Sequence, residues 1–184
     1  MITQGHTQRI VKPSHAVVRV RRASACRGVL SFSGLTIPCA LGRSGIRAIK
    51  REGDGASPRG SWSVVCVLYH PGRVRRPRTR LPVHLIGVDD GWCDEVGDRN
   101  YNCRVKHPYP VSAEKMRRDD GLYDFVVVLN YNMRPRVQGR GSAIFLHVAR
   151  DGYLPTEGCI AVKRDHLQRM LLTLSRYSII RIGQ

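Results

Sequence analysis

Two residues in the C-terminal third of the chain have the types and surroundings of a nucleophile and its base. The stretch from 141 to 163 reads GSAIFLHVARDGYLPTEGCIAVK, and its apolar run AIFLH predicts a buried β-strand that ends at His147. A loop follows, and Cys159 then precedes a second apolar run, IAV. A free thiol has a pKa of about 8.5, which a neighbouring imidazolium lowers by several units. The pair therefore predicts a thiolate that attacks a carbonyl while the imidazole protonates the leaving amine.

Gly158 has a predicted role beside this nucleophile. A residue without a Cβ lets backbone N–H groups turn toward the position where an oxyanion forms. The alternative is that both His147 and Cys159 are packing residues, since buried strands often contain either type. Residue type and spacing leave both interpretations open.

Two motifs carry a resemblance to a known family. His147 followed by residues 156–160, TEGCI, resembles the signature of the L,D-transpeptidases (YkuD-type catalytic domain), a His followed after a loop by Ser/Thr-His-Gly-Cys-Ile/Val. Upstream, residues 50–62, KREGDGASPRGSW, resemble the family's Gly/Lys…Thr-Pro-x-Gly-x-Phe segment, with Ser57-Pro58 in place of Thr-Pro and Trp62 in place of Phe. The two motifs stand in the family's order.

The resemblance covers about residues 40–183 and implies a fold. That fold is mainly β, a mixed β-sandwich or barrel with one or two short helices. At 184 residues the chain also has the length of one domain, so we expect a single catalytic domain over 1–184.

The resemblance also implies an activity. Cys159 would form a thioester with a peptidoglycan tetrapeptide stem, His147 would move the proton, and Gly158, Glu157 and Thr156 would line the oxyanion hole or orient the base. A stem-peptide amine then resolves the thioester and forms a cross-link, or water resolves it in a carboxypeptidase reaction. The implied partners are stem peptides and the anionic wall polymer, with no cofactor, and carbapenems are the implied inhibitors.

Three positions depart from the family pattern. Glu157 replaces the second His of the signature, Val148 follows His147 where Gly or Ser is usual, and Ala161 stands where Arg or Asn is usual. The Glu157 carboxylate could hold the imidazolium, bind a substrate amine, or face solvent in a turn. The departures also leave open a catalytically inactive wall-binding module.

The charge balance of the chain indicates a polyanionic partner. Thirty-one Lys and Arg against fourteen Asp and Glu give a net charge of +17. Nucleic acid, an anionic membrane surface and an anionic wall polymer all satisfy this requirement. Aromatic residues make up only 7% of the chain and do not alternate with basic ones as stacking platforms require, which argues against nucleic acid. The basic run at 73–80, RVRRPRTR, could contact glycan or phosphate, or form a solvated loop.

The sequence says less about export and oligomeric state than about the catalytic residues. No apolar segment is long enough to span a membrane, and residues 1–22 lack the 7–15-residue apolar core of a signal peptide. An export signal outside this sequence, another export route, or a cytoplasmic protein would each explain this. Because the family's substrate lies outside the membrane, we favour the first, and hence the periplasm or cell envelope. We expect a monomer.

The six cysteines do not predict a metal site. They lie at 26, 39, 66, 93, 103 and 159, without a C-x-x-C pair and without zinc spacing to the seven histidines. A catalytic Cys159 must be free, so at least one other thiol is expected to be free as well. Cys66, in the apolar run SVVCVLY, is predicted to be a buried core residue.

Residues 89–124 differ in composition and are predicted to be an insertion that covers the cleft like a lid. They hold nine of the fourteen acidic residues and are punctuated by Gly and Pro. We expect a short helix near 112–119, capped by Ser112. The spacing in DDGWCDEVGD does not match a calcium loop. The candidate contacts to a peptide stem, with a self-bonded structural loop as the alternative, are Trp92, Arg99, Asn100 and Tyr101.

The remaining segments predict a β-rich frame with one clear helix. Alternation at 16–22 indicates a half-exposed strand, and Gly, Pro and Ser between residues 26 and 45 indicate hairpins. Strands are also expected at 61–70, 123–132 and 178–183. Leu167, Met170, Leu171 and Leu174 recur at helical spacing within 164–176, which predicts an amphipathic helix on the sheet.

Overall fold

The computed structural model describes residues 15–20 and 26–183, with side chains from 26 onward. The N-terminal segment that bears on export therefore lies largely outside the described residues. The elements in chain order are β1 (His15–Val20), β2 (Arg27–Phe32), β3 (Leu35–Ala40), β4 (Ile46–Arg47), β5 (Ser57–Pro58), β6 (Gly60–Tyr69), β7 (Val83–Leu85), β8 (Asp90–Cys93), β9 (Arg104–Lys106), β10 (Ala113–Lys115), β11 (Phe125–Leu129), β12 (Phe145–Val148), η1 (Asp151–Tyr153), β13 (Ile160–Val162), α1 (Arg164–Thr173) and β14 (Ile179–Gly183).

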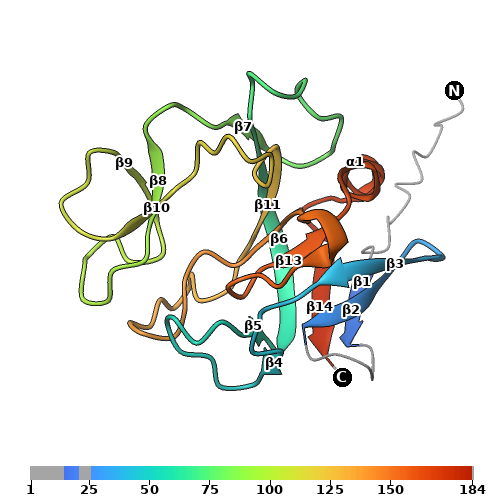
Figure 1. Cartoon of the computed structure of the whole chain (residues 1–184), viewed down its shortest axis with the longest axis horizontal. Helices are drawn as coiled ribbons and strands as arrows, with labels where there is room; N and C mark the ends of the chain where they lie inside the picture. Colours follow the sequence, from blue (N-terminus) through green and yellow to red (C-terminus); the bar gives the residue numbers. More distant parts are fainter. Residues whose placement is uncertain (1–14, 21–25, 184) are drawn as a thin grey trace, which may run out of the picture.

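Across the described residues the fold is mainly β, with mixed sheets and one α-helix, as the sequence predicts (Figure 1). Nine strands form the main sheet in the order β11-β12-β13-β3-β2-β1-β14-β6-β7, and β11 also pairs with β6. The sheet thus folds back on itself around a core. It is not a regular barrel, because β13 and β3 share only the residue pair Ala161↔Ala40.

The strands next to the site have a buried side chain on both faces. On one face, Leu146 and Val148 of β12 and Ile160 and Val162 of β13 join the main core. The other face begins with Phe145, which belongs to a second buried cluster. Because successive side chains of a strand point to opposite faces, neighbouring residues such as Phe145 and Leu146 enter different clusters.

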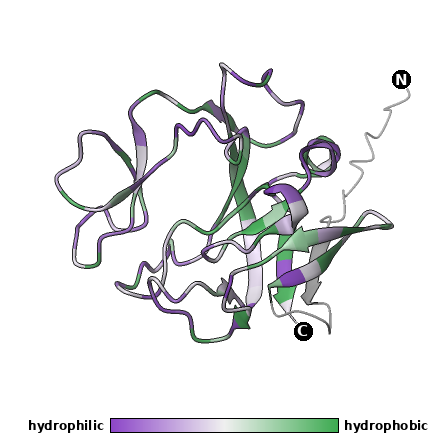
Figure 2. Ribbon diagram, in the orientation of Figure 1, coloured by the Kyte–Doolittle hydropathy of each residue, from purple (hydrophilic) through white to green (hydrophobic). Residues whose placement is uncertain are grey.

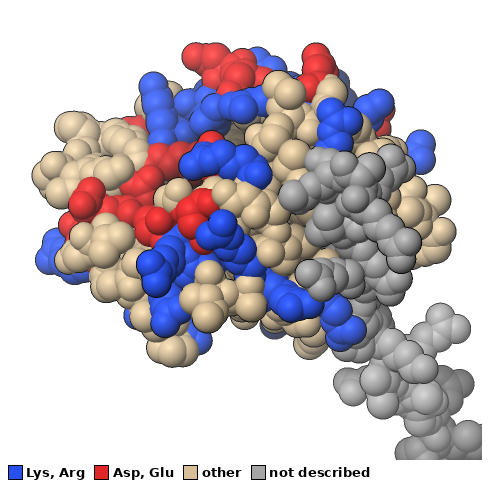
Figure 3. All heavy atoms as spheres, turned by 60° about the horizontal axis from the view of Figure 1, so that its bottom comes forward, with Lys and Arg blue, Asp and Glu red and all other residues tan. Residues whose placement is uncertain are grey.

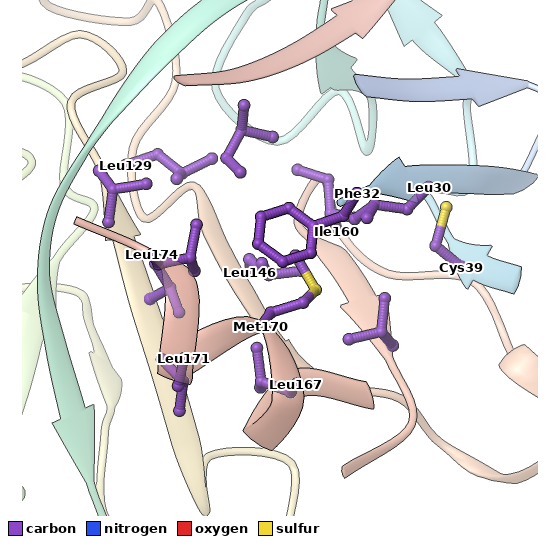
Figure 4. Close-up of a cluster of buried hydrophobic side chains, with 14 of the residues drawn as sticks. Leu30, Phe32, Cys39, Leu129, Leu146, Ile160, Leu167, Met170, Leu171 and Leu174 are labelled. Carbon is purple, nitrogen blue, oxygen red and sulfur yellow. The ribbon is translucent and has the colours of Figure 1, made fainter. Parts of the chain in front are cut away.

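Helix α1 closes the main core, as its apolar spacing predicts. Leu167, Met170, Leu171 and Leu174 are all at most 2% exposed and pack toward Leu146 and its neighbours (Figure 4). The outer side of the helix is mostly hydrophilic, whereas β6 carries a hydrophobic stretch (Figure 2). Helix α1 therefore packs on the face of the sheet that carries Leu146 and Ile160, and none of its side chains lines the cavity described below.

The insertion at 89–124 forms a small sheet of its own, in the order β10-β8-β9. These strands lie on the opposite side of β11 from α1 (Figure 1). The expected helix near 112–119 with its cap at Ser112 is wrong. Residues 113–115 instead pair with 91–93 as strand β10, and Met116 is fully buried, so tertiary pairing outweighs local helical preference.

Two smaller expectations are also resolved. Residues 73–80 form an irregular, largely exposed loop. Cys66 is only half-buried rather than fully buried, because it lies at a position of β6 that packs at the margin of the second cluster. No helix in the described part of the chain is long and apolar enough to cross a membrane.

Candidate active site

Strand pairing brings Cys159 and His147 onto the same face of the main sheet. Strands β12 and β13 are parallel, with His147 opposite Ala161 and Leu146 opposite Ile160. Cys159 is two residues before Ala161, so its side chain points to the same face as those of Ala161 and His147. Both side chains line one cavity of about 410 Å³. The two groups therefore meet the first geometric requirement of a thiol–imidazole pair.

The Cys159 thiol is held by two backbone groups. Its Sγ donates to the carbonyl oxygen of Ala143 at 3.1 Å and accepts from the N–H of Phe145 at 3.3 Å. The side chain is nearly buried, with the residue 9% exposed. The hydrogen bond from the Phe145 N–H would be stronger to a thiolate than to a thiol, because hydrogen bonds to ionised acceptors are stronger than those to neutral ones.

The His147 ring is oriented by a backbone carbonyl. Its Nδ1 lies 2.9 Å from the carbonyl oxygen of Val148, which can only accept, so Nδ1 carries the proton and Nε2 is left as the basic atom. The Tyr123 ring packs edge-on against the imidazole, with the centroids 5.4 Å apart. The Tyr123 hydroxyl in turn donates to Glu114. The His147 ring is thus oriented by the Val148 carbonyl and the Tyr123 ring, roles that the sequence does not indicate.

Burial favours the neutral form of both groups. It lowers the pKa of His147 to about 4, although the hydrogen bond to Val148 acts in the opposite direction. It raises the pKa of Cys159 to about 12, helped by the Glu114 carboxylate and opposed by the Phe145 N–H and by Lys50. No hydrogen bond joins the thiol to the imidazole, and looser geometry is common before a substrate enters.

The turn that presents Cys159 is braced on both sides. Thr156 Oγ1 donates to the carbonyl oxygen of Cys159 at 2.6 Å and accepts from the Gly158 N–H at 3.2 Å. Ser57, from the Ser-Pro motif, also donates to the Cys159 carbonyl, at 3.3 Å. Gly158 has φ of 140°, and a Cβ there would meet the Ala56 carbonyl oxygen at 2.8 Å. The two motifs quoted above therefore contact each other, and only glycine fits at position 158.

Glu157 lies apart from the base. Its side chain is 79% exposed and forms an ion pair with Arg43 at the rim of the cavity. The role of orienting His147 is filled by the Val148 carbonyl instead. Glu157 remains available to an approaching substrate.

Residues of the insertion contact Phe145 and Ala143, the two residues whose backbone groups bind the Cys159 thiol. Trp92 is 4% exposed, packs edge-on against Phe145 and donates its Nε1–H to Asn102 Oδ1 at 3.0 Å. The same oxygen accepts the N–H of Ala143 at 3.1 Å. Ala143 has φ of 51°, an unfavourable conformation for a residue with a Cβ, and its carbonyl is the one that binds the Cys159 thiol. Asn102 thus holds a strained backbone unit against the Cys159 thiol.

The four residues predicted to contact a peptide stem do not line the cavity. Trp92 is buried as described, and Tyr101 is fully buried, with its hydroxyl bound to Glu52 and to the N–H of Gly141. Asn100 donates to the Tyr109 hydroxyl at 2.8 Å, and Arg99 is exposed, with its carbonyl bound by an arginine of a neighbouring loop. These contacts correspond to the self-bonded loop of the alternative interpretation.

Charges of both signs surround the cavity. Its lining includes three basic side chains and four acidic ones, namely Lys50, Arg118 and Arg150, and Glu52, Asp94, Glu114 and Glu157. On the face drawn in Figure 3, acidic side chains form a group bordered by lysine and arginine. This concentration of acids is unusual on a chain of +17, and it favours a ligand that carries both charges.

Among the residues that the structure describes, no three His, Cys, Asp or Glu side chains are arranged so that they could hold a metal ion. Cys39, Cys66, Cys93, Cys103 and Cys159 are free thiols.

Comparison with known proteins agrees with these motifs. The model of the L,D-transpeptidase catalytic domain family (YkuD) matches residues 13–182. A search of the curated proteins gives no match. Among solved structures, an L,D-transpeptidase from Mycobacterium smegmatis is 16% identical, with a TM-score of 0.43, over 94% of this chain and 59% of that one. The chain therefore spans about 59% of the length of that protein. With nearly its whole length matched by the family model, the chain belongs to the L,D-transpeptidase catalytic domain (YkuD) family.

Proposed function

We propose that this protein is a cysteine-dependent peptidoglycan L,D-transpeptidase. The observation that carries the proposal is the placement of the Cys159 thiol and the His147 imidazole on one sheet face, in one cavity, each bonded to backbone groups that orient it. An inactive wall-binding module would have no need of a buried thiol beside a base of defined tautomer. The family's substrate implies work in the periplasm or cell envelope.

The first half-reaction is an acyl transfer to sulfur. His147 Nε2 takes the thiol proton as Sγ attacks the carbonyl of the L-centre in a tetrapeptide stem. The new S–C bond forms, the C–N bond to the terminal D-residue breaks, and His147 returns the proton to the leaving amine. Burial raises the pKa of Cys159 and lowers that of His147, so we expect the thiolate to form as this proton moves.

The second half-reaction decides the product. An amine of a second stem attacks the thioester to form a cross-link, with His147 accepting its proton. Water attacking at the same carbonyl gives carboxypeptidase activity, which is the second candidate function. Which of them prevails depends on whether the acceptor fills the cavity and excludes water.

Two acids of the insertion are suited to hold the acceptor amine. Asp94 and Glu114 both line the cavity, and Asp94 Oδ1 is buried without a hydrogen-bond partner among the described residues. The other acids of residues 89–124 lie outside the lining. Salt screens the attraction between exposed charges beyond about 8–10 Å at ordinary ionic strength. Only acids at the cavity are therefore expected to attract the acceptor amine.

Turnover of purified disaccharide-tetrapeptide tests the proposal. The wild-type protein should release D-alanine and form dimer, and Cys159→Ala should do neither. Asp94→Asn should reduce dimer more than released D-alanine, whereas Asp119→Asn, an acid of the insertion outside the cavity, should change neither. Replacing the whole segment 91–102 by a Gly/Ser linker is less selective, because it also removes Trp92 and Asn102. Wild-type protein that yields neither product would refute the proposal.

A further inference from the structure

Lys50 is a buried cation at the cavity for which the steps above provide no role. The residue is 4% exposed, and its Nζ donates to Asp54 Oδ1 at 2.7 Å and to the Arg51 carbonyl at 3.3 Å. An ammonium group has three N–H donors, so one remains. Lysine is almost never fully buried without a partner, and here the partner leaves a donor for a further acceptor.

Two glycines of the catalytic loops make room for this lysine. A Cβ at Gly141 would lie 2.8 Å from Lys50 Cε, and a Cβ at Gly158 would lie 3.4 Å from Lys50 Nζ. Both glycines have positive φ, of 97° and 140°. The ammonium group is therefore held directly beside the turn that presents Cys159.

Ser142 is a second unexplained polar group at the same place. The residue is 6% exposed, lines the cavity, and its Oγ is buried without a hydrogen-bond partner among the described residues. It immediately precedes Ala143, whose carbonyl binds the Cys159 thiol. A buried hydroxyl without a partner is unfavourable, and a hydrogen bond to a ligand oxygen would remove this cost.

We propose that Lys50 and Ser142 complete the oxyanion hole, donating to the acyl oxygen of the substrate together with the N–H of Cys159. Backbone N–H groups alone offer few hydrogen-bond donors to this acyl oxygen. The Gly158 N–H is already bound to Thr156 Oγ1 at 3.2 Å, so it is not free to bind an oxyanion. A fixed cation aimed at a developing negative charge is among the strongest means of stabilising such an intermediate.

Lys50 and Ser142 both donate hydrogen bonds to the oxygen that becomes negative in the same step. As the Sγ–C bond forms, the carbonyl π pair moves onto oxygen, where Lys50 Nζ–H, Ser142 Oγ–H and Cys159 N–H donate to it. When the intermediate collapses, the pair returns to re-form the carbonyl and the C–N bond to the leaving amine breaks. Lys50 and Ser142 donate without transferring their protons, and the leaving amine takes its proton from His147. This inference rests on the proposed function and adds the residues that bind the intermediate.

Two reagents separate an effect on the oxyanion from an effect on the thiol. Iodoacetamide alkylates a thiolate without forming an oxyanion, whereas a carbapenem must pass through a tetrahedral oxyanion to acylate it. We compare Lys50→Gln/Asp54→Asn, which keeps an uncharged hydrogen bond between the two side chains, with Asp54→Asn alone as the matched control. Ser142→Ala is a second, independent variant with no ion pair to disturb.

The double variant should acylate at least about tenfold more slowly than Asp54→Asn, since one oxyanion donor is worth about 10²–10³ in rate and Gln retains part of it. Alkylation should fall by a smaller factor. Ser142→Ala should slow acylation and leave alkylation unchanged.

Equal losses in both reactions, or no loss of acylation in either variant, would overturn the inference. If the double variant does not fold by circular dichroism, Ser142→Ala decides. A wild-type protein that reacts with neither reagent at Cys159 would instead refute the proposed function.

Discussion

Asn102 is predicted to link the insertion to the nucleophile, and removing its side chain should impair both stability and chemistry. We choose Asn102→Gly because Asn102 has φ of 56°, which glycine adopts without strain. The change therefore removes four hydrogen bonds without disturbing the backbone. Two of the partners are donors, the Trp92 indole N–H and the Ala143 N–H, and the other two are the carbonyls of Tyr131 and Asn132.

The magnitude follows from the two donors left without an acceptor. Each buried, unsatisfied donor costs about 1–3 kcal/mol, so the free energy of unfolding should fall by about 2–6 kcal/mol. Ala143 would also be freed from its strained φ of 51°, which displaces the carbonyl that binds the thiol. A displacement of about 1 Å at a reacting group can cost about 10²-fold in rate.

Guanidinium denaturation and the rate of carbapenem acylation measure the two effects. Asn100→Ala is the control, because Asn100 lies in the same insertion but, among the described residues, its side chain bonds only to Tyr109. That variant should lose at most about 1.5 kcal/mol and acylate at the wild-type rate. If Asn102→Gly were as stable and as reactive as Asn100→Ala, the insertion would not support the nucleophile.

The remaining predictions concern the pair itself and its rim. Cys159→Ala should abolish the covalent adduct seen by mass spectrometry, whereas Cys66→Ala, at a half-buried position, should retain it; an adduct on the first variant would overturn the assignment. The pKa of Cys159 is raised to about 12 and that of His147 is lowered to about 4. The rate of thiol alkylation should therefore increase about tenfold per pH unit from pH 6 to 9. A plateau of the rate in this range would indicate a resting thiolate–imidazolium ion pair instead. Glu157→Gln should leave acylation and the melting temperature nearly unchanged, since an exposed ion pair contributes about 0–1 kcal/mol; a large loss of acylation would give Glu157 a direct role.

The frame of the molecule follows from local patterns in the sequence. The apolar runs at β11, β12 and β13 predict buried strands, and the spacing of Leu167, Met170 and Leu171 predicts the helix that packs on them. Alternation shows which residues of one strand share a face, whereas the pairing of β12 with β13 brings His147 and Cys159 onto the same face. These predictions depend on periodicity, which tertiary contacts rarely override in long apolar segments.

The surroundings of the pair depend on contacts between distant segments, and the sequence does not reveal them. The Val148 carbonyl orients the base through a backbone atom, which no residue type indicates. Residues 113–115 form a strand only because residues 91–93 lie alongside them. Asn102 supports a backbone unit 41 positions away. Lys50 belongs to a motif that the sequence does single out, but its burial beside Gly158 emerges only from the fold.

The central claim is that Cys159 is an acylated nucleophile, and the most direct measurement is peptide mapping after reaction with disaccharide-tetrapeptide or a carbapenem. We expect a mass increase on the peptide that contains Cys159, formed by the wild-type protein and reduced strongly in His147→Gln. A mass increase on any other cysteine, or an unmodified Cys159 in folded wild-type protein, would contradict the account.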